Sequence, residues 1–552
     1  MPITRRHFAA AMAACTAAAA PSTASLDPDL VRRHDEAVDR ILRQQITDPA
    51  DPHRGGYPDE YGLFSAGTGA GLCDTLIAAY VFPGSRHHKS AEVAGRFHLA
   101  AGYLTRMQNS DGTIDLLVTN FHSTPDLGFV THSAAGAAWI ARHFNEPELF
   151  AALEPFLRKA GKALATGGIH TPNHRWVVCE ALSQVQELLP DPAYPRRIAQ
   201  WLAEGIDIDS DGQFDERSTT VYNTVSDKAL LVTGLKTGRP ELLEPVRRNL
   251  QAMLYLLHPG GEVVTEISTR QDQYDRAGMD RYWFPLRYFA ITENNGQFAN
   301  LVRSVEPRAG SLSFYLRYPE LQKPLPPAQP LPEDFEKLMP AIQIARFRRG
   351  PRSASILLNG NSRFFTMRQG GCVVEAVRFA SAFFGKGQFR ASSYEKTADG
   401  YRMTQELEGP YYQPFDPPRR VEASQWGALR SQRRQSNVER MRYTVTVREK
   451  GKGFAIDMEA QGTVGVPLAV EVNLRQNTLL DGVTEAPKVA GGFLLKKGYA
   501  VARSGGDALR FGPGLSQHTY TQVRGADAKL PGPSVYLCGL TPFKHTLEFE
   551  AL

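Results

Sequence analysis

The sequence predicts an α+β multidomain fold, with a helical domain first and an antiparallel β-sandwich after it. Three observations predict this order. Apolar residues recur at helical spacing from Leu26 to about Tyr318, they alternate at every second position late in the chain, and a proline-rich segment lies between the two regions. At 552 residues the chain is too long for one ordinary core, so two large domains or three small ones are expected.

In the helical region, apolar residues form stripes with members three or four positions apart. Segments rich in glycine and proline, such as 54–58 and 259–261, separate the stripes. The pattern predicts roughly ten helices joined by loops of modest length, which favours a ring of helical hairpins over a short bundle. The three clearest stripes are Val31, Val38, Ile41 and Leu42; Leu149, Leu153, Phe156, Leu157 and Leu164; and Leu243, Val246, Leu250, Met253 and Leu257.

The segment 323–335 is dense in proline and is predicted to be a semi-rigid linker between domains 26–322 and 336–552. Beyond it, Tyr443, Val445 and Val447 alternate with polar residues, and residues 454–458 and 468–474 repeat the pattern. Asn359–Gly360 between two apolar runs indicates a hairpin. Many short strands of this kind predict an antiparallel sandwich.

Residues 1–25 have the features of an export signal. The pair Arg5–Arg6, with Phe8 after it, precedes an alanine-rich stretch at 9–20 and resembles a bacterial twin-arginine signal. The stretch is too short to span a bilayer, which needs about 20 apolar residues. We therefore predict cleavage between residues 18 and 25 and a periplasmic or secreted protein. The alternatives are a lipoprotein anchored through Cys15 and a frayed helix on a cytosolic protein.

Charge and cysteine spacing narrow the function classes. The formal net charge of +5 is small for this length and no dense Lys/Arg stripe appears, so nothing favours nucleic acid as a partner. Cys73, Cys179, Cys372 and Cys538 are widely separated and lack metal-site spacing. Because twin-arginine substrates fold in a reducing cytosol, these cysteines are expected to be buried thiols.

Two segments carry residues suited to chemistry. In the first, Pro172 precedes a helix predicted to begin near Asn173, so Asn173, His174 and Arg175 fall at a helix N-terminus that favours an anion. The structural alternative is that Asn173 caps the helix, His174 packs and Arg175 is solvated. In the second, polar residues 211–223 lead into another helix. Tyr222 there can exchange a proton if cations lower its pKa, or it can be an ordinary core tyrosine.

These segments resemble those of heparinase II/III-like and alginate-lyase-like polysaccharide lyases. The resemblance is carried by Asn173–His174 with Trp176 close behind, and by the polar stretch from Asp211 to Asn223. It implies an N-terminal (α/α) toroid followed by a C-terminal antiparallel β-sandwich. It also implies β-elimination on a uronic-acid glycan, in which the C5 proton is removed and the C4 oxygen leaves. The family often has Tyr-His where this chain has Tyr222–Asn223. The difference leaves open which second residue assists Tyr222 in proton transfer.

The resemblance also implies a role for each residue. Asn173, with help from Arg175, binds the uronate carboxylate and stabilises the developing enediolate. Tyr222 protonates the leaving oxygen, and it also serves as base when the proton and leaving group lie on the same face. His174 is the base when they lie on opposite faces. No organic cofactor is required.

Further residues are candidates for binding substrate or a metal ion. Asp207, Asp209 and Asp211 match the start of a calcium loop, but Ser218 stands where a bidentate Glu is expected, so an acidic turn is the simpler interpretation. The segment 123–128 is predicted to be a loop before a helix starting near Thr131, and 411–413 a loop that reaches the cleft. The substrate-binding candidates are Asn120, His122, His132, Arg217, Arg270, Gln271 and Trp283.

Two other functions are compatible with the sequence. A glycoside hydrolase on the same kind of toroid needs a pair of carboxylates, and a non-catalytic periplasmic glycan-binding protein needs only the aromatic cleft. The hydrolase would draw its carboxylates from Asp126, Asp211, Asp215, Glu216 and Asp272.

Overall fold

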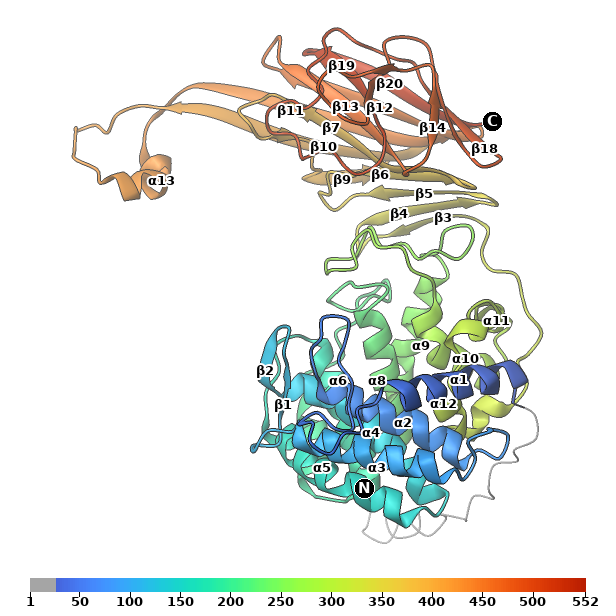
Figure 1. Ribbon diagram of the computed structural model, residues 1–552. Coiled ribbons are helices and arrows are strands. Elements are labelled where there is room, and N and C mark those ends of the chain that lie inside the picture. Colours follow the sequence, from blue (N-terminus) through green and yellow to red (C-terminus); the bar gives the residue numbers. More distant parts are fainter. Residues whose placement is uncertain (1–25) are drawn as a thin grey trace, which may run out of the picture. The chain divides into compact units, whose positions relative to one another are not determined.

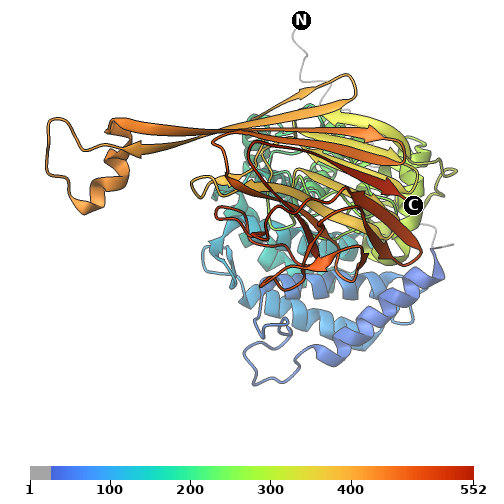
Figure 2. The same ribbon diagram turned by 90° about the horizontal axis from the view of Figure 1, so that it is seen from above.

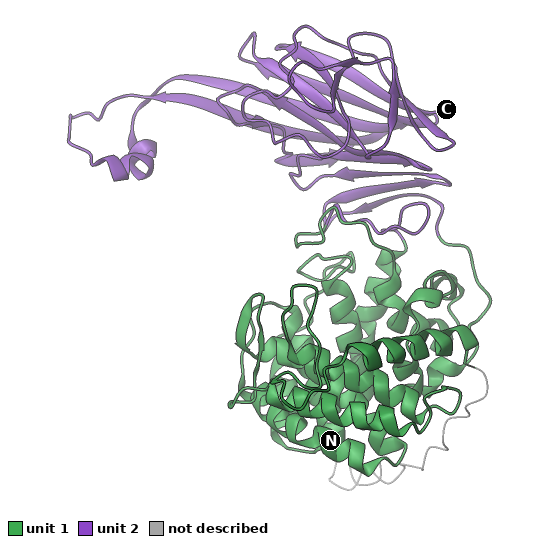
Figure 3. Cartoon of the chain, in the orientation of Figure 1, with its two compact units in different colours: residues 1–254, 268–331 green, residues 255–267, 332–552 purple. Residues whose placement is uncertain are grey.

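The computed structural model describes residues 26–552 (Figure 1), so the predicted signal peptide, with Cys15, lies outside the described residues. The chain divides into two compact units, which Figure 3 colours separately. The first unit contains the residues up to 254 together with 268–331, and the second contains 255–267 and 332–552. The segment 255–267 therefore belongs with the strands rather than with the helices around it. No helix within residues 26–552 is long and apolar enough to cross a membrane.

The first unit consists of inner and outer helices that alternate along the chain. The inner helices are α2 (Ala66–Val81), α4 (Thr124–His143), α6 (Asn173–Leu188), α8 (Tyr222–Thr237), α10 (Trp283–Thr292) and α12 (Leu312–Arg317). The outer helices are α1 (Pro28–Gln44), α3 (Ala91–Arg106), α5 (Pro147–Thr166), α7 (Ala193–Leu202), α9 (Leu243–Met253) and α11 (Gly296–Ala309).

The inner helices form a ring. They pack side by side in the order α2, α4, α6, α8 and α10, and α12 returns to contact α2 and α4. Ser313 of α12 donates a hydrogen bond of 2.6 Å to Asp74 of α2. On its other side, the ring centroid of Phe314 lies 4.6 Å from that of Phe284 on α10. This closure confirms the predicted toroid.

Burial separates the two sets of helices. α6 is buried at almost every position, whereas the outer helix α1 buries only Leu30, Asp35, Val38 and Ile41. The three predicted stripes lie on α1, α5 and α9, which confirms the helical pattern there, although Leu257 falls beyond the end of α9.

The predicted loop at 123–128 is wrong, because α4 begins at Thr124 instead of near Thr131. The Ser123 hydroxyl accepts the Asp126 N–H at 3.2 Å and caps the helix. Pro125 lies in the first turn, where its missing N–H has no intrahelical partner to lose. A Cβ on Gly128 would lie 2.9 Å from the Val177 side chain, so this glycine allows α4 to approach α6 closely.

The second unit is a sandwich of two sheets. The first sheet has the strand order β14 (Leu479–Asp481), β17 (Ala500–Ser504), β18 (Asp507–Gly512), β20 (Phe543–Ala551), β12 (Gly453–Gly462), β11 (Gln435–Lys450), β10 (Gly400–Tyr412) and β9 (Ser393–Lys396). The second has the order β15 (Thr484–Glu485), β16 (Gly492–Leu494), β19 (Ser534–Leu540), β13 (Pro467–Leu474), β7 (Cys372–Ser381), β6 (Phe365–Gln369), β5 (Arg352–Leu357), β4 (Ile344–Arg349) and β3 (Asp334–Met339), with β8 (Gly387–Gln388) paired to β7.

The strand predictions are confirmed where the alternation is clear. Tyr443, Val445 and Val447 of β11 enter the core between the two sheets, where the Tyr443 ring centroid lies 5.3 Å from that of Phe379 on β7. The predicted hairpin at 359–360 joins β5 to β6, which are antiparallel. The pairs are antiparallel throughout the named strands except for β16 with β19. Residues 411 and 412 belong to β10, so the loop predicted there is wrong.

All four cysteines of the described chain, Cys73, Cys179, Cys372 and Cys538, are buried free thiols, as the sequence predicts. Burial raises the pKa of the Cys179 and Cys538 thiols to about 12, which keeps both protonated and unreactive at neutral pH.

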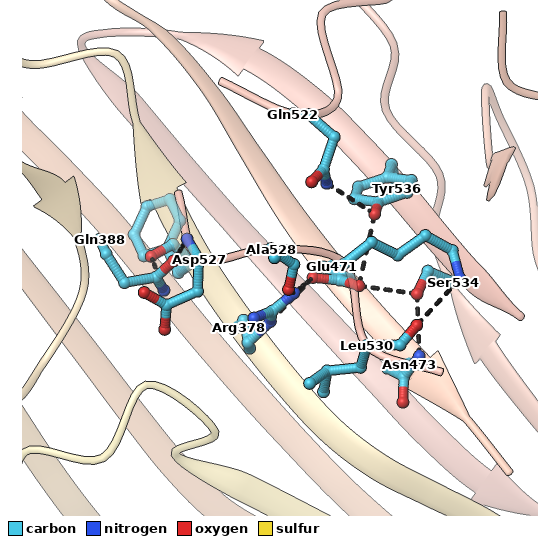
Figure 4. Close-up of polar contacts among 12 residues, drawn as sticks. Arg378, Gln388, Glu471, Asn473, Gln522, Asp527, Ala528, Leu530, Ser534 and Tyr536 are labelled. Atoms are coloured by element: carbon cyan, nitrogen blue, oxygen red, sulfur yellow. Dashed lines mark hydrogen bonds and ion pairs between the residues drawn. The ribbon is translucent and has the colours of Figure 1, made fainter. Parts of the chain in front are cut away.

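A buried ion pair holds a loop over the outer face of the second sheet (Figure 4). Arg378 of β7 and Glu471 of β13 lie opposite each other, with Nε and Oε2 2.8 Å apart and side chains 4% and 7% exposed. The guanidinium also donates to the Ala528 carbonyl at 2.9 Å. The second carboxylate oxygen of Glu471 accepts from Ser534 at 2.6 Å and from Tyr536 at 3.3 Å. The pair therefore joins two strands and the loop that covers them.

Arg378→Met is expected to lower the free energy of unfolding of the second unit by about 3–5 kcal/mol, because Glu471 is left charged, buried and unpaired. Adding Glu471→Gln recovers part of this loss, since a neutral amide needs no counter-charge. Chemical denaturation followed by circular dichroism measures both effects. Arg402→Met, which breaks an exposed pair with Glu395, is the control and changes little. Equal stability of Arg378→Met and the control would contradict the prediction.

Candidate functional site

The N-terminus of α6 holds a buried carboxylate. Asn173 is the first residue of the helix, and its Nδ2 donates to Glu216 Oε1 at 2.5 Å. The Asn173 backbone N–H donates to the same oxygen at 3.2 Å. Asn173 and Glu216 are only 2% and 7% exposed. Glu216 thus fixes the orientation of the Asn173 amide, whose second N–H makes a longer bond of 3.3 Å to Thr171.

Tyr222 is the first residue of α8 and is half-buried. Its backbone N–H donates to Ser218 Oγ at 3.1 Å, which anchors the start of the helix. Gln271 Nε2 donates to the Tyr222 hydroxyl oxygen at 3.1 Å. The Arg270 guanidinium lies over the tyrosine ring, 5.2 Å from its centroid, in a cation–π arrangement.

Arg270 links Tyr222 to the Asn173–Glu216 pair. Its Nε lies 3.7 Å from Glu216 Oε2, on the oxygen that Asn173 does not contact. The guanidinium also lowers the pKa of His174, so it acts on that ring as well. Arg270 therefore lies between Tyr222 and Glu216, the carboxylate that holds Asn173, although the three segments are separate in the sequence.

Asp272 holds the two loops of the site together. Its carboxylate is 1% exposed and accepts hydrogen bonds from Ser218 Oγ, from the Thr220 N–H and from the Thr220 hydroxyl, each at 3.0 Å. Ser268 Oγ donates to it at 3.1 Å. The Thr269 N–H donates to the Arg217 carbonyl at 2.9 Å and completes the join. The sequence showed Asp272 only as one carboxylate among several, and the hydroxyls of 218–220 before a helix were the signal for its role.

His174 is a neutral imidazole at neutral pH. Burial lowers its pKa to about 4, with smaller effects of His170 and Arg270 in the same direction and of Asp126 against it. Its Nδ1 is 3.0 Å from the Thr171 hydroxyl. The ring centroid of His170 lies 4.7 Å away, edge to face. A buried neutral histidine of this kind can accept a proton without first losing one.

Two of the predicted site residues, Arg175 and His132, already have ion-pair partners within the protein. Arg175 bonds Asp207 at 3.1 Å and Glu204 at 3.2 Å, and its guanidinium stacks on Trp176, so it is held by the loop after α7. His132 lies in the toroid interior with Nδ1 2.6 Å from Glu180 Oε1, and burial lowers its pKa to about 4.

The remaining candidates lie at the edges of the site or outside it. Trp283 donates to Glu306 at 3.1 Å and packs on Tyr315, inside the helical core. Asn120 donates to Asp126 at 2.8 Å. His122 is exposed and pairs with Asp111 at 2.8 Å, an interaction that raises the His122 pKa.

The acidic turn at 207–211 serves the protein's own structure. Asp207 accepts the Trp176 indole N–H at 2.9 Å besides its pairing with Arg175. Asp209 accepts the backbone N–H groups of Asp211 and Gln213 at 2.8 and 3.0 Å. Within residues 26–552 no group of three or more His, Cys, Asp or Glu side chains is arranged to hold a metal ion. Calcium at Asp207, Asp209 and Asp211 stays a prediction.

The fold has known counterparts, although no family model and no curated protein matches the sequence. A chondroitin AC lyase of Streptomyces coelicolor, solved with chondroitin sulphate, is 14% identical with a TM-score of 0.57, and the match covers 97% of this chain and 80% of that one. A Paenibacillus xanthan lyase is 10% identical with a TM-score of 0.57, over 95% of this chain and 57% of that one. A heparinase III is 9% identical with a TM-score of 0.52, over 98% and 87%.

This chain has the fold of these polysaccharide lyases. The likeness spans both the toroid and the sandwich, and it confirms at the level of the fold the resemblance stated from the sequence. At 9–14% identity it concerns the fold alone, so the activity has to be argued from the site itself.

We predict that His174 contributes to loss of stability in acid. Its folded pKa of about 4 is below the ordinary 6.5, so the unfolded state takes up a proton first as pH falls. Stability from this group is complete above pH 6.5 and is lost as pH falls to about 4. Melting temperatures across this window should fall less for His174→Gln than for wild type. His122→Gln is the control, because its raised pKa has the opposite sign. The prediction would be contradicted if the melting temperature of His174→Gln fell with pH as steeply as that of wild type.

Proposed function

We propose that the protein is a polysaccharide lyase that cleaves a uronic-acid-containing glycan by β-elimination. The observation that carries the proposal is the position of Arg270, whose guanidinium lies over the Tyr222 ring and 3.7 Å from Glu216, the carboxylate that holds the buried Asn173 amide. His174, a neutral imidazole, follows Asn173 in the chain. β-Elimination needs these functions: a donor for the carboxylate, a base for the C5 proton and an acid for the leaving oxygen. The lyases that share the fold support the same reaction class.

Carboxylate neutralisation is assigned to Asn173 and Arg270. The C5 proton of a uronate becomes acidic only when the charge on the adjacent carboxylate is offset by amide or cationic donors. Asn173 lies at a helix N-terminus with its amide donating to Glu216, so it binds the uronate carboxylate by exchanging that bond for one to the substrate. Arg270 has a side chain 38% exposed to solvent. Arg175, the cation first predicted for this role, already bonds Glu204 and Asp207. Arg270 is therefore the better placed cation.

Proton transfer is assigned to Tyr222 and His174. The base takes the C5 proton, the C5–H electron pair forms the C4=C5 double bond, and the C4–O bond breaks with protonation of the leaving oxygen. Tyr222 supplies that proton; Gln271 donates a hydrogen bond to its oxygen, and the Arg270 guanidinium lies over its ring. Tyr222 also serves as base in a syn elimination, and neutral His174 serves in an anti elimination.

Two of the five carboxylates that a hydrolase could use, Glu216 and Asp272, already hold the protein's own structure. Glu216 is bonded by Asn173, and Asp272 accepts four hydrogen bonds from the loops that it joins. Neither is left as the solvent-facing acid or base that glycoside hydrolysis needs.

We further propose export by the twin-arginine route, which rests on Arg5–Arg6 and Phe8 in the sequence.

The deciding experiment incubates the mature protein with alginate, heparan sulfate, hyaluronan, chondroitin and glucuronan in turn. A lyase produces an unsaturated uronate that absorbs in the ultraviolet. Tyr222→Phe is expected to lower the rate at which this absorbance rises by about 10²–10⁴-fold, because general acid–base catalysis is lost. Substrate binding should persist because only one hydroxyl is removed. New reducing ends without absorbance would identify a hydrolase instead, and near-normal turnover by Tyr222→Phe would refute the mechanism.

Asn173→Ala is expected to lower kcat by about 10²–10³-fold, as other losses of an oxyanion donor do. The amide neutralises charge that develops in the transition state, so kcat should fall more than KM rises. Arg175→Lys serves as the comparison, because Arg175 is held by the loop at 204–207 and should affect rate only a few-fold. Initial rates of ultraviolet absorbance measure both variants. A larger effect at Arg175 than at Asn173 would reverse the assignment.

A further inference from the structure

Strands β10 and β11 form an arm that extends beyond the sheet to which they belong. They pair with each other from Gly400 opposite Arg448 to Tyr412 opposite Gln435. Their outer neighbours stop earlier: β9 pairs with β10 only over 401–404, and β12 pairs with β11 only over 441–450. From Glu408, opposite Arg440, outwards the ribbon is two-stranded. Both views show it projecting from the sandwich with α13 at its end (Figures 1 and 2).

The end of the arm, residues 413–434, has no core of its own. Its helical turns are η4 (Ala423–Gln425), α13 (Trp426–Leu429) and η5 (Arg430–Gln432), and none of the three contains a buried residue. Trp426 is 50% exposed. A segment of this length that buries no apolar side chain adds little to the stability of the sandwich. We call residues 413–434 the arm tip.

Guanidinium groups stacked on aromatic rings organise the arm tip. Arg433 lies against both Phe415 and Trp426, with its guanidinium carbon 4.3 and 4.1 Å from the ring centroids. Arg419 lies over the same Phe415 ring at 3.9 Å, and Arg430 lies 5.5 Å from the centroid of Tyr412 at the end of β10. Stacking leaves the N–H edges of a guanidinium available for other partners.

The arm tip carries positive charge that the protein does not neutralise. It holds five arginines against Asp416 and Glu422, a formal net charge of +3. Arg420 pairs with Glu422 at 3.4 Å. Among the residues that the structure describes, no carboxylate lies within ion-pair distance of the other four arginines, which are Arg419, Arg430, Arg433 and Arg434.

The shaft of the same arm, residues 405–412 of β10 with 435–443 of β11, shows the opposite arrangement. Arg440 faces Glu408 across the ladder at 3.1 Å, and Arg442 faces Glu406 at 3.7 Å. Cross-strand pairs of this kind neutralise the shaft. The unpaired charge is therefore confined to the tip, next to an exposed tryptophan.

We propose that the arm tip is a second, non-catalytic binding site for acidic polysaccharide. Arginine forks match carboxylate and sulfate groups, and an exposed aromatic ring can stack on a sugar face, so the tip has both contacts that such a chain needs. The choice of occupant rests on the proposed function, which makes an acidic glycan the substrate. A tip on a separate arm would hold a long chain and raise its local concentration for the toroid site.

The test measures binding separately from cleavage, in the full-length mature protein. The Tyr222→Phe background prevents turnover, and long heparan sulfate and alginate chains are titrated at low salt. Changing Arg419, Arg430, Arg433 and Arg434 together to Gln should weaken binding on the order of ten- to a hundredfold, since each exposed pair contributes a modest amount. The effect should shrink as salt is raised, because exposed charges are screened.

The matched control removes four arginines that are already paired on the same unit: Arg402, Arg440, Arg442 and Arg503. It should leave the affinity within about twofold, since these charges are neutralised in place. A second variant replaces residues 413–434 by an Asn-Gly turn between Tyr412 and Gln435, which are already paired. It should lose the same affinity as the quadruple tip variant, and melting temperatures check that both are folded.

The outcomes separate this proposal from the lyase proposal. Tip-dependent binding of glycan without unsaturated product from wild type would support the arm tip and refute the lyase. Unsaturated product from wild type, together with glycan binding that is unchanged in the tip variants, would support the lyase and refute the arm tip as a binding site. Two further results would overturn the arm tip as a glycan site: a change of oligomeric state in the tip variants by light scattering, which would identify a second copy as the occupant, or tip-dependent binding only to vesicles of anionic phospholipid.

Discussion

The buried carboxylate of Asp272 is the interaction on which the geometry of the site depends. It accepts hydrogen bonds from both sides of the join between residues 218–220 and residues 268–272. One of its donors, Ser218, also accepts the N–H that starts α8, so the position of Tyr222 follows from that carboxylate. The Tyr222 ring then meets Arg270 and Gln271, which are the immediate neighbours of Asp272 in sequence. A single buried charge thereby orders the tyrosine and the cation together.

The toroid imposes a second constraint. Because its inner helices are largely buried, polar residues in the middle of one pack against other inner helices. His132, Glu180 and Lys228 meet in this way across three inner helices, with Glu180 1% exposed. Polar residues that are to meet a substrate have to lie at helix ends instead. Asn173 and Tyr222 are each the first residue of an inner helix.

Charged side chains are used in two ways in this protein. In the sandwich, Arg378 and Glu471 are buried and joined, and the shaft of the long arm pairs each arginine with a facing glutamate. At the site, Arg270 is shared among a carboxylate, an aromatic ring and solvent, and at the arm tip four arginines have no carboxylate partner among the described residues. Paired charges hold structure, whereas the incompletely paired ones are the places where an acidic ligand gains most.

The sequence by itself determined the order of the two domains, because apolar periodicity is a local property of each segment. It also led us to predict catalytic roles for Asn173, His174, Arg175 and Tyr222 and a substrate-binding role for Arg270. It placed the start of α6 correctly and that of α4 wrongly, because Ser123 and Pro125 form a helix start that also looks like a loop. Only the tertiary structure decided the partners of the two candidate cations. The sequence does not distinguish Arg175 from Arg270. In the structure, Arg175 forms ion pairs with Glu204 and Asp207, whereas the Arg270 guanidinium lies over the Tyr222 ring. The same holds for Asp272 and for the arm tip, since hydrogen bonds and ion pairs between residues distant in sequence exist only once the chain has folded.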